Sequence, residues 1–493
     1  MKRNQSAKIA LLLALLSLSG TLSSCGGTAG TASDDPELPA ETLLSVPETE
    51  TETEDASSAR LSELSALDYG GRDFCVIGRL EYDDELCVSE SDGEVLNDAV
   101  YDRNQAMQEL LNVNLTWEIG ENEYSDFGKT AILAGEDTYD AMMIHSRMAF
   151  NFMNDGLLHD WNEDMPYTDL SASYWSQDMR EHIAVGNKIY FMSGDISYYF
   201  LADTQVMLFN KRLFRDLDFA SPYQTVRDGK WTFDYMKSLA STAAADLDGD
   251  GVMKGENDRL GYITTHWRGP NFVYIAEGTR LITLDGNKMP EFTLDLARSE
   301  QIYTRYLEFL QSDAAKMFGE VEDASMLNVW MSGEVLFFDG LLKYASRMRD
   351  MEDDFGVLPM PKFDEAQENY LSTPGAGINF YAVPVSAGDT ECTSAVLETL
   401  AVLGQRDVMP AYYEEALKGK YARDEESAEM LDLIRQNIIV DFGSLIYGHT
   451  VNKLNSIGYF LSDPKNKLGF SAFYDANIKT FEKYLQEVIE LLS

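Results

Sequence analysis

The sequence predicts an α/β fold in which strands alternate with helices, and two patterns in its first half carry this prediction. The first is a series of short apolar runs at residues 74–77, 113–117 and 140–144, each of a length typical of a buried strand. The second is the segment 96–111, where apolar residues recur near helical spacing. Strand, helix and strand in that order imply parallel pairing with helices on both faces of the sheet. In open sheets of this kind, ligands bind beyond the carboxyl ends of the strands.

The charge of the chain excludes one class of partner. Among its 493 residues, 39 Lys and Arg stand against 83 Asp and Glu, for a formal net charge of −44. Such a chain has no electrostatic means of binding phosphate backbones, so we exclude nucleic acid as a partner. The body after residue 68 is long enough for two or more packed cores, and it contains no apolar run long enough to span a membrane.

The first 25 residues read as a secretory leader. Met1-Lys2-Arg3 is basic, an apolar run begins at Ile9, and small residues precede a cysteine in Leu22-Ser-Ser-Cys25. This ending resembles the lipobox of bacterial lipoproteins, which implies that Cys25 is lipidated and becomes the first residue of the mature chain. We therefore expect the protein on the extracellular side of the bacterial cytoplasmic membrane, held by a lipid anchor. An ordinary signal peptide or a membrane span is the alternative, but the run is shorter than the roughly 20 residues of a span.

Residues 26–68 are predicted to be a disordered acidic linker. They are rich in Gly, Thr, Ser, Ala, Pro and Glu and have almost no aromatic residues, so they bury too little apolar surface to offset the ordering entropy. A coil of about 40 residues has a reach of about 35 Å from the bilayer.

Cysteines and histidines predict neither a disulfide framework nor a zinc site. Cys75, Cys87 and Cys392 follow Cys25, and we expect buried free thiols, with a local pair between Cys75 and Cys87 as the alternative. The five histidines have no metal-ligand spacing.

An acidic loop at residues 246–258 resembles the calcium loop of an EF-hand or dockerin repeat. Carboxylates occupy loop positions 1, 3 and 5, and Gly251 stands at position 6, where the turn is sharp. Position 12 is Asn257 instead of the glutamate of the pattern, so the closing ligand departs from it. We predict a structural Ca²⁺, with a solvated acidic turn as the alternative; no other cofactor is expected. The predicted ligands are Asp246, Asp248, Asp250, the Val252 carbonyl and Asp258.

Six segments, taken in order, resemble the extracellular solute-binding proteins of family 1, the lipid-anchored receptors of bacterial carbohydrate ABC importers. They are Gly135–Met143, Asp155–Leu158, Asp169–Trp175, Lys188–Asp195, Leu208–Phe214 and Phe355–Pro361. The resemblance runs from about Phe74 to the C-terminus. It implies the type II periplasmic-binding-protein fold, in which two α/β lobes are joined by a hinge and close on a ligand in the interlobe cleft. It also implies a monomer that delivers its ligand to a membrane permease.

The family-like segments imply where the lobes divide. Lobe 1 is expected at residues 69–200 and 338–384, and lobe 2 at 201–337 and 385–493. Hinges of this kind let rigid lobes rotate and absorb the motion at a few residues.

The resemblance also implies candidate ligand contacts at the edges of this cleft. Sugars present apolar faces and hydroxyl groups, so a site needs flat aromatic rings and polar side chains. Residues of both kinds follow the strands or lie near residues 196–204, where the chain is expected to cross first from one lobe to the other: His145, Arg147, Tyr199, Asp203, Trp267, Arg268 and Asn271. Where maltose-binding relatives place a stacking tryptophan, this chain has Leu341-Leu342, which argues against a maltodextrin ligand.

We therefore predict a receptor, not an enzyme, that captures a carbohydrate, most simply an oligosaccharide. A receptor for peptides or other non-sugar ligands shares the fold and is the first alternative. A surface glycoside hydrolase is the second, although among 83 acidic residues no carboxylate pair stands out and no nucleophile, phosphate-loop or metal motif supports catalysis.

Overall fold

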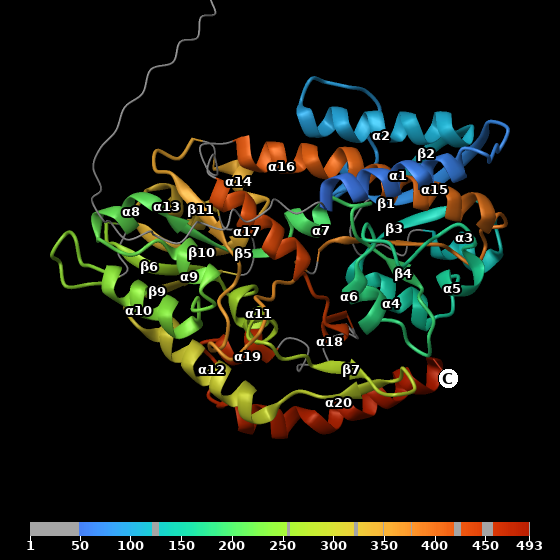
Figure 1. The fold of residues 1–493 in the computed structure, drawn as a ribbon. Helices are drawn as coiled ribbons and strands as arrows, with labels where there is room; N and C mark the ends of the chain where they lie inside the picture. The colour runs from blue at the N-terminus through green and yellow to red at the C-terminus, as the bar shows by residue number, and fades with distance from the viewer. Residues whose placement is uncertain are drawn as a thin grey trace, which may run out of the picture. The chain divides into compact units, whose positions relative to one another are not determined.

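The computed structural model describes residues 49–120, 128–253, 257–319, 324–348, 350–375, 377–418, 425–445 and 457–492 (Figure 1). Residues Glu50–Ser493 form one compact unit. The predicted leader and Cys25 lie outside the described residues. No helix among the described residues is both long and apolar enough to cross a bilayer.

The first of two five-stranded sheets defines lobe 1, with strand order β2-β1-β3-β12-β4. Strand β1 pairs in parallel with β2 and with β3, whereas β12 runs antiparallel to β3 and β4. The predicted strands and the helix between them are therefore confirmed. The strands are β1 Arg72–Arg79, β2 Val113–Gly120, β3 Ala141–His145, β4 Phe191–Met192 and β12 Asn379–Ala382.

Helices from both ends of the chain cover the lobe 1 sheet. Helices α15 and α16 come from the last quarter of the chain and pack against α2, beside which they lie in Figure 1. The helices of this lobe are α1 Thr49–Leu64, η1 Asp83–Glu85, α2 Val95–Leu111, α3 Lys129–Ala134, α4 Ser146–Asn154, α5 Trp161–Asp164, α6 Gln177–His182, α7 Tyr199–Ala202, α15 Thr390–Leu403, η2 Gly404–Val408 and α16 Met409–Lys418.

The second sheet defines lobe 2, with strand order β11-β5-β10-β6-β9. All residues of β5, β6 and β10 are buried, as expected for strands covered on both faces. Its strands are β5 Gln205–Asn210, β6 Leu260–Thr265, β9 Ala315–Phe318, β10 Val335–Leu341 and β11 Phe355–Leu358; a separate hairpin joins β7 Ile282–Leu284 to β8 Pro290–Phe292.

Lobe 2 also holds most of the C-terminal helices. The long α20 packs against α12 and reaches α4 of lobe 1 (Figure 1). The helices are α8 Lys211–Asp216, α9 Pro222–Arg227, α10 Phe233–Ala243, α11 Gly269–Ala276, α12 Leu296–Gln311, α13 Ala324–Met331, α14 Tyr344–Arg347, α17 Glu425–Gln436, α18 Phe442–Leu445, α19 Ile457–Ser462 and α20 Phe470–Leu492.

Two crossing segments join the lobes side by side. The first runs from Ser193 through α7 into β5, and the second leads from lobe 2 into β12 through residues 372–375 and 377–378. The segments contact each other, because Gly375 donates its N–H to the Asp203 carbonyl at 2.7 Å. A Cβ atom at Gly375 would lie 2.3 Å from Asp203 Oδ2, so a larger residue there would displace the Asp203 carboxylate.

The predicted lobe boundaries are wrong at two places. Residue 338 lies inside β10, and both β10 and β11 belong to the second sheet. The chain therefore returns to lobe 1 only at β12. Helix α15, predicted in lobe 2, packs on α2 of lobe 1. The error arose because strand pairing joins residues far apart in the sequence, and local patterns do not report which sheet a strand enters.

The predicted linker also ends earlier than residue 68. Helix α1 is acidic, but Leu61 and Leu64 are buried. Arg60 donates to Glu398 at 3.0 Å, which ties α1 to α15. These contacts supply the stabilisation that the segment lacks by itself. The alternative of a Cys75–Cys87 pair is also wrong, since both residues and Cys392 are free thiols.

Candidate ligand site

The crossing brings Tyr82, Tyr199, Asp203 and Lys343 into one cluster, which we call the crossing cluster. Lys343 Nζ lies 2.6 Å from Asp203 Oδ1 and donates to the Tyr82 hydroxyl at 2.5 Å. The Tyr82 hydroxyl in turn donates to Asp203 at 3.3 Å. Tyr82 follows β1 of lobe 1, whereas Lys343 follows β10 of lobe 2, so these contacts connect the lobes beside the first crossing segment.

Aromatic rings form the lobe 1 side of the crossing cluster. The ring centroids of Tyr82 and Tyr199 are 4.3 Å apart, and those of Tyr198 and Tyr199 are 4.4 Å apart. Asp84 orients Tyr199 of α7 and Tyr198 before it, since its Oδ2 accepts the hydroxyl protons of Tyr198 at 2.9 Å and of Tyr199 at 3.1 Å. Tyr82 and Tyr199 are partly exposed. They therefore offer flat faces next to charged and hydroxyl groups, the combination that sugar recognition needs.

Lobe 2 contributes Trp267 and Arg268, which follow the carboxyl end of β6. The Arg268 guanidinium lies 4.8 Å from the centre of the Tyr344 ring, and Tyr344 is adjacent in the chain to Lys343. The Trp267 ring packs edge-on against Tyr459, with centroids 5.2 Å apart. Arg268 is therefore connected to the crossing cluster through Tyr344, the neighbour of Lys343. Trp267 is the residue before Arg268 in the chain.

The buried carboxyl of Asp339 holds the end of β6 in place through hydrogen bonds. Asp339 accepts from Gln205 at 2.7 Å, Tyr262 at 2.8 Å and Thr264 at 3.1 Å. Burial raises the pKa of Asp339. Gly269 lies against this network, since a Cβ there would be 2.8 Å from Asp339 Oδ2. The network fixes the position at which α11 begins.

The other predicted contacts differ in what the structure shows of them. His145 is buried at the end of β3, opposite Asn379 in the ladder. Asn271 is buried as well, and its Oδ1 accepts the Tyr459 N–H at 2.8 Å, so it already anchors α19 to α11. The side chain of Arg147 lies outside the described residues. Direct ligand contact by these three residues stays a prediction.

Sequence reasoning missed Tyr82 and Lys343. Tyr82 follows β1, so the rule that ligands bind beyond the carboxyl ends of parallel strands would have found it. Lys343 follows β10, which the predicted boundary at residue 338 divided between the lobes, and its pairing with Asp203 had no local signal.

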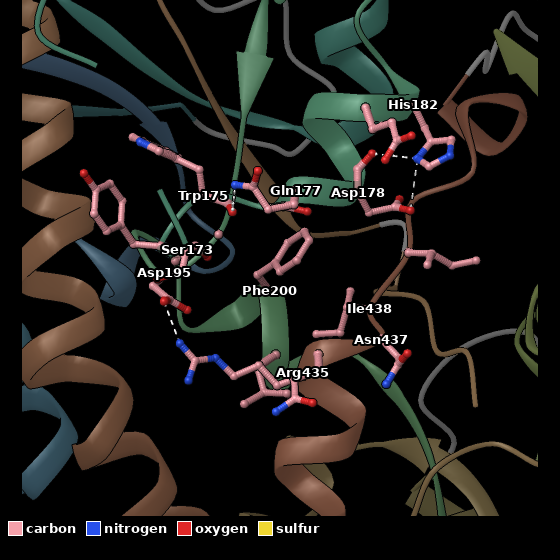
Figure 2. Close-up of a pocket in the computed structure, with 18 of the residues that line it drawn as sticks. Ser173, Trp175, Gln177, Asp178, His182, Asp195, Phe200, Arg435, Asn437 and Ile438 are labelled. Carbon is pink, nitrogen blue, oxygen red and sulfur yellow. Dashed lines mark hydrogen bonds and ion pairs between the residues drawn. The ribbon is translucent and has the colours of Figure 1, made fainter. Parts of the chain in front are cut away.

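A separate pocket of about 520 Å³ lies between α6, the first crossing segment and the end of α17 (Figure 2). Phe200 occupies its middle, and the Asp195–Arg435 ion pair, at 2.6 Å, stands at one end. At the other end Asp178 accepts the Val440 N–H at 2.7 Å and pairs with Arg280. The volume suits a small ligand. None of the sequence-predicted contacts lines this pocket.

The acidic loop has a geometry that suits a cation. One carboxylate oxygen from each of Asp246, Asp248 and Asp250 lies within 4.8 Å of the others. Asp258 is buried and accepts the Leu247 N–H at 3.2 Å, which ties the end of the loop to its start. Hard oxygen ligands that converge in this way fit Ca²⁺.

Comparison with known proteins gives a structural likeness without a sequence match. The sequence matches no family model and no curated protein. The structure resembles a cyclo/maltodextrin-binding protein complexed with maltotetraose, with a TM-score of 0.51 and 13% identity over 85% of this chain and 96% of that one.

Two further solved structures show the same likeness. A sugar transporter from Rhizobium etli in an open conformation has a TM-score of 0.52 and 14% identity, over 85% of this chain and 98% of that one. The maltose/maltodextrin-binding domain from Bdellovibrio bacteriovorus bound to maltotriose has a TM-score of 0.52 and 13% identity, over 84% of this chain and 100% of that one. At such identities a likeness shows the fold alone. The chain therefore has the type II periplasmic-binding-protein fold, with two α/β lobes joined by crossing segments.

Proposed function

We propose that the protein is a lipid-anchored extracellular receptor, not an enzyme, that captures a carbohydrate and delivers it to the permease of an ABC importer. One observation carries the proposal. Flat tyrosine faces from lobe 1 meet charged side chains from lobe 2 at the crossing cluster, where Tyr82 contacts both Tyr199 and Lys343. The fold, shared with three solved sugar-binding proteins, supports it.

The arrangement of the lobes suggests how capture becomes a signal. A sugar that contacts Tyr199 on one lobe and Trp267 or Arg268 on the other favours the closed state by its greater affinity for that state. Rotation about the crossing segments then changes the surface that the permease meets. The receptor works as a monomer in this scheme.

Cys25 is proposed to carry the lipid anchor. Two or more acyl chains give stable attachment where one does not. With helix α1 packed on lobe 1, residues 26–48 are left as the tether. A Cys25→Ser variant is expected in the culture medium or as an uncleaved precursor, and a processed variant that still needs detergent for extraction would contradict the anchor.

A thermal-shift panel tests the ligand class. It contains maltotriose, cellotriose, mannobiose, raffinose and a tetrapeptide, and the proposal expects a rise in melting temperature with at least one sugar. Tight binding of the tetrapeptide alone would favour the peptide receptor. Consumption of a sugar during the assay would favour the glycoside hydrolase.

Replacement of Trp267 tests the site itself. Trp267→Ala is expected to weaken binding of the stabilising sugar roughly thirtyfold, about 2 kcal/mol, because aromatic truncations dominate well-packed sites. Trp117→Ala, on the edge strand β2, is the matched control and should leave the affinity unchanged. Calorimetry that finds equal affinities for Trp267→Ala and the wild type would refute the site assignment and leave the receptor in place.

A structural Ca²⁺ in the acidic loop is a second proposal, carried by the convergent carboxylates of Asp246, Asp248 and Asp250. The ion binds the folded chain and not the unfolded one, so the melting temperature is expected to rise with calcium concentration. Asp248→Ala should abolish that rise. Equal melting with calcium and with chelator would leave only a solvated turn.

A further inference from the structure

Glu85 lies at the point where three parts of lobe 1 meet. It ends η1, the turn that begins after Tyr82 and contains Asp84. Its side chain is fully buried. Its Oε2 accepts the hydroxyl proton of Ser197, which belongs to the first crossing segment. Its Oε1 accepts from Asn379 at 3.1 Å, and Asn379 is the residue at which the second crossing segment enters β12. One carboxyl group therefore holds the lobe 1 ends of both crossing segments.

The same carboxyl is linked to the candidate sugar site. Asp84, its neighbour in the chain, orients the hydroxyl groups of Tyr198 and Tyr199. Asn379 stands opposite His145 in the β3–β12 ladder and also accepts from Arg79 at 2.6 Å. A shift of Glu85 would thus be transmitted to Tyr198 and Tyr199 and to the end of β3.

Neutral groups supply the hydrogen bonds to this carboxyl. Besides Ser197 and Asn379, Tyr381 donates its hydroxyl proton to Oε1 at 3.2 Å. The buried Arg103 directs its donors to the carbonyl oxygens of Ile196 at 3.0 Å and of Glu85 itself at 2.7 Å. The titratable or charged side chains that surround Glu85 come from η1, the following loop, α2, the first crossing and β12: Asp84, Cys87, Arg103, Tyr199 and Tyr381.

Both protonation states can exist at ordinary pH. Burial, opposed by the bonds from Ser197 and Asn379, raises the pKa of Glu85 to about 7. A neutral carboxyl can donate through Oε2 to Ser197 Oγ and still accept at Oε1 from Asn379 and Tyr381, so each of its own oxygens keeps a partner in the protonated form. An ionised carboxylate in the same place gains by any opening that lets in water.

We propose that Glu85 is a positioning residue whose proton sets how firmly lobe 1 holds the two crossing segments and the tyrosines of the candidate site. With the proton bound, the crossing segments are held; with the proton lost, they open more often. The link to sugar capture rests on the function proposed above. The contacts of Glu85 with Ser197 and Asn379, which we call the clamp, do not depend on any ligand.

Hydrogen exchange of the full chain without ligand tests the clamp. Amide protection is measured in peptides that cover residues 193–204 and 372–382 at pH 5.5 and 8.0, after correction for intrinsic exchange rates. In the wild type, protection is expected to be about tenfold or more lower at pH 8.0, because opening lets Glu85 regain its ordinary pKa. In Glu85→Gln, which keeps the shape and cannot ionise, protection should be equal at both pH values.

Glu277→Gln is the matched control. Glu277 is also a buried glutamate whose pKa burial raises to about 7, but it pairs with Arg305 at the far end of α11 in lobe 2. This variant should keep the wild-type pH response in the crossing peptides. A response that survives Glu85→Gln, or one that Glu277→Gln abolishes, would overturn the proposal.

Tyr381→Phe provides a second variant should Glu85→Gln fold poorly. Loss of one donor to the carboxylate raises the Glu85 pKa further, so the midpoint of the pH response should move upward. An unchanged midpoint would also overturn the proposal. Since no sugar enters these measurements, failure of the sugar panel bears on the proposed function alone.

Discussion

Two carboxylates of lobe 1, the buried Glu85 beside the crossing segments and the partly buried Asp178 on α6, differ in the direction of their pKa shifts. Burial raises the pKa of Glu85 to about 7. Burial acts on Asp178 in the same way, but the hydrogen bond from His182 and the charge of Arg280 outweigh it and lower the pKa. Desolvation is common to both groups, so the partners decide the outcome. Neutral donors leave Glu85 ready to hold a proton, whereas the hydrogen bond from His182 and the charge of Arg280 keep Asp178 ionised.

The two carboxylates also connect different parts of the molecule. Asp178 reaches across to lobe 2, where it pairs with Arg280 and accepts the Val440 N–H at 2.7 Å. Glu85 binds groups within lobe 1 and at the ends of the crossing segments. We infer that rotation of the lobes breaks the contacts of Asp178 and only strains those of Glu85. Asp178 therefore keeps its charge in a contact between the lobes, whereas Glu85 can gain or lose a proton where it holds the crossing segments.

The largest expected effect comes from a third carboxylate, Asp203, which lies at the crossing but has a cation for its partner. Lys343→Met leaves Asp203 buried without that partner, and we expect a loss of roughly 3–5 kcal/mol in the free energy of unfolding. Denaturant unfolding at pH 7 measures it. The control Lys230→Met removes an exposed lysine 3.7 Å from Asp228 and should change little. Similar losses of unfolding free energy in Lys343→Met and Lys230→Met would show that the buried Lys343–Asp203 pair contributes no more to stability than an exposed pair.

The next effect is a fall in stability with rising pH caused by Glu85. Its pKa is about 7 in the folded chain against an ordinary 4.5. The folded state therefore binds the proton more tightly, so the contribution is complete below pH 4.5 and is lost as the pH rises through 7. We expect about 3 kcal/mol between these limits.

Urea unfolding at several pH values checks this dependence. Glu277 contributes in the same direction, as does the buried Asp339, so Glu85→Gln should remove part of the fall and the double variant with Glu277→Gln a larger part. A slope that the double variant leaves intact would contradict both assignments.

The smallest expected effect is that of Asp178→Asn. The lowered pKa of Asp178 means that its contribution is present above the ordinary value of 3.8 and is lost as the pH falls through the folded value. At pH 7 we expect a loss of about 1–2 kcal/mol, because the amide keeps part of the hydrogen bonding. Small-angle scattering should show a larger radius of gyration, since the contact with Arg280 is weakened. Asp234→Asn, at an exposed site, is the control. An unchanged radius of gyration in Asp178→Asn would show that the Asp178–Arg280 contact does not help to hold the lobes together.

Local structure could be predicted from the sequence because it depends on neighbouring residues. The strand predicted at 74–77 lies within β1, the helix predicted at 96–111 within α2, and the strand predicted at 113–117 within β2. Apolar spacing decides such elements wherever one face is buried. Tyr199 and Asp203 were predicted on another basis, because the resemblance to family 1 receptors implied that the chain crosses between the lobes at this segment.

Only the tertiary structure decided which distant residues meet. Helix α1 is held by an Arg60–Glu398 bond across 338 positions of sequence, so its composition alone predicted disorder. Glu85 and Lys343 gained their roles from burial and from partners on other elements. Strand pairing and desolvation act between segments that local patterns treat separately, and for that reason the sequence determined the elements of this protein while the fold determined its sheets, its crossing cluster and its clamp.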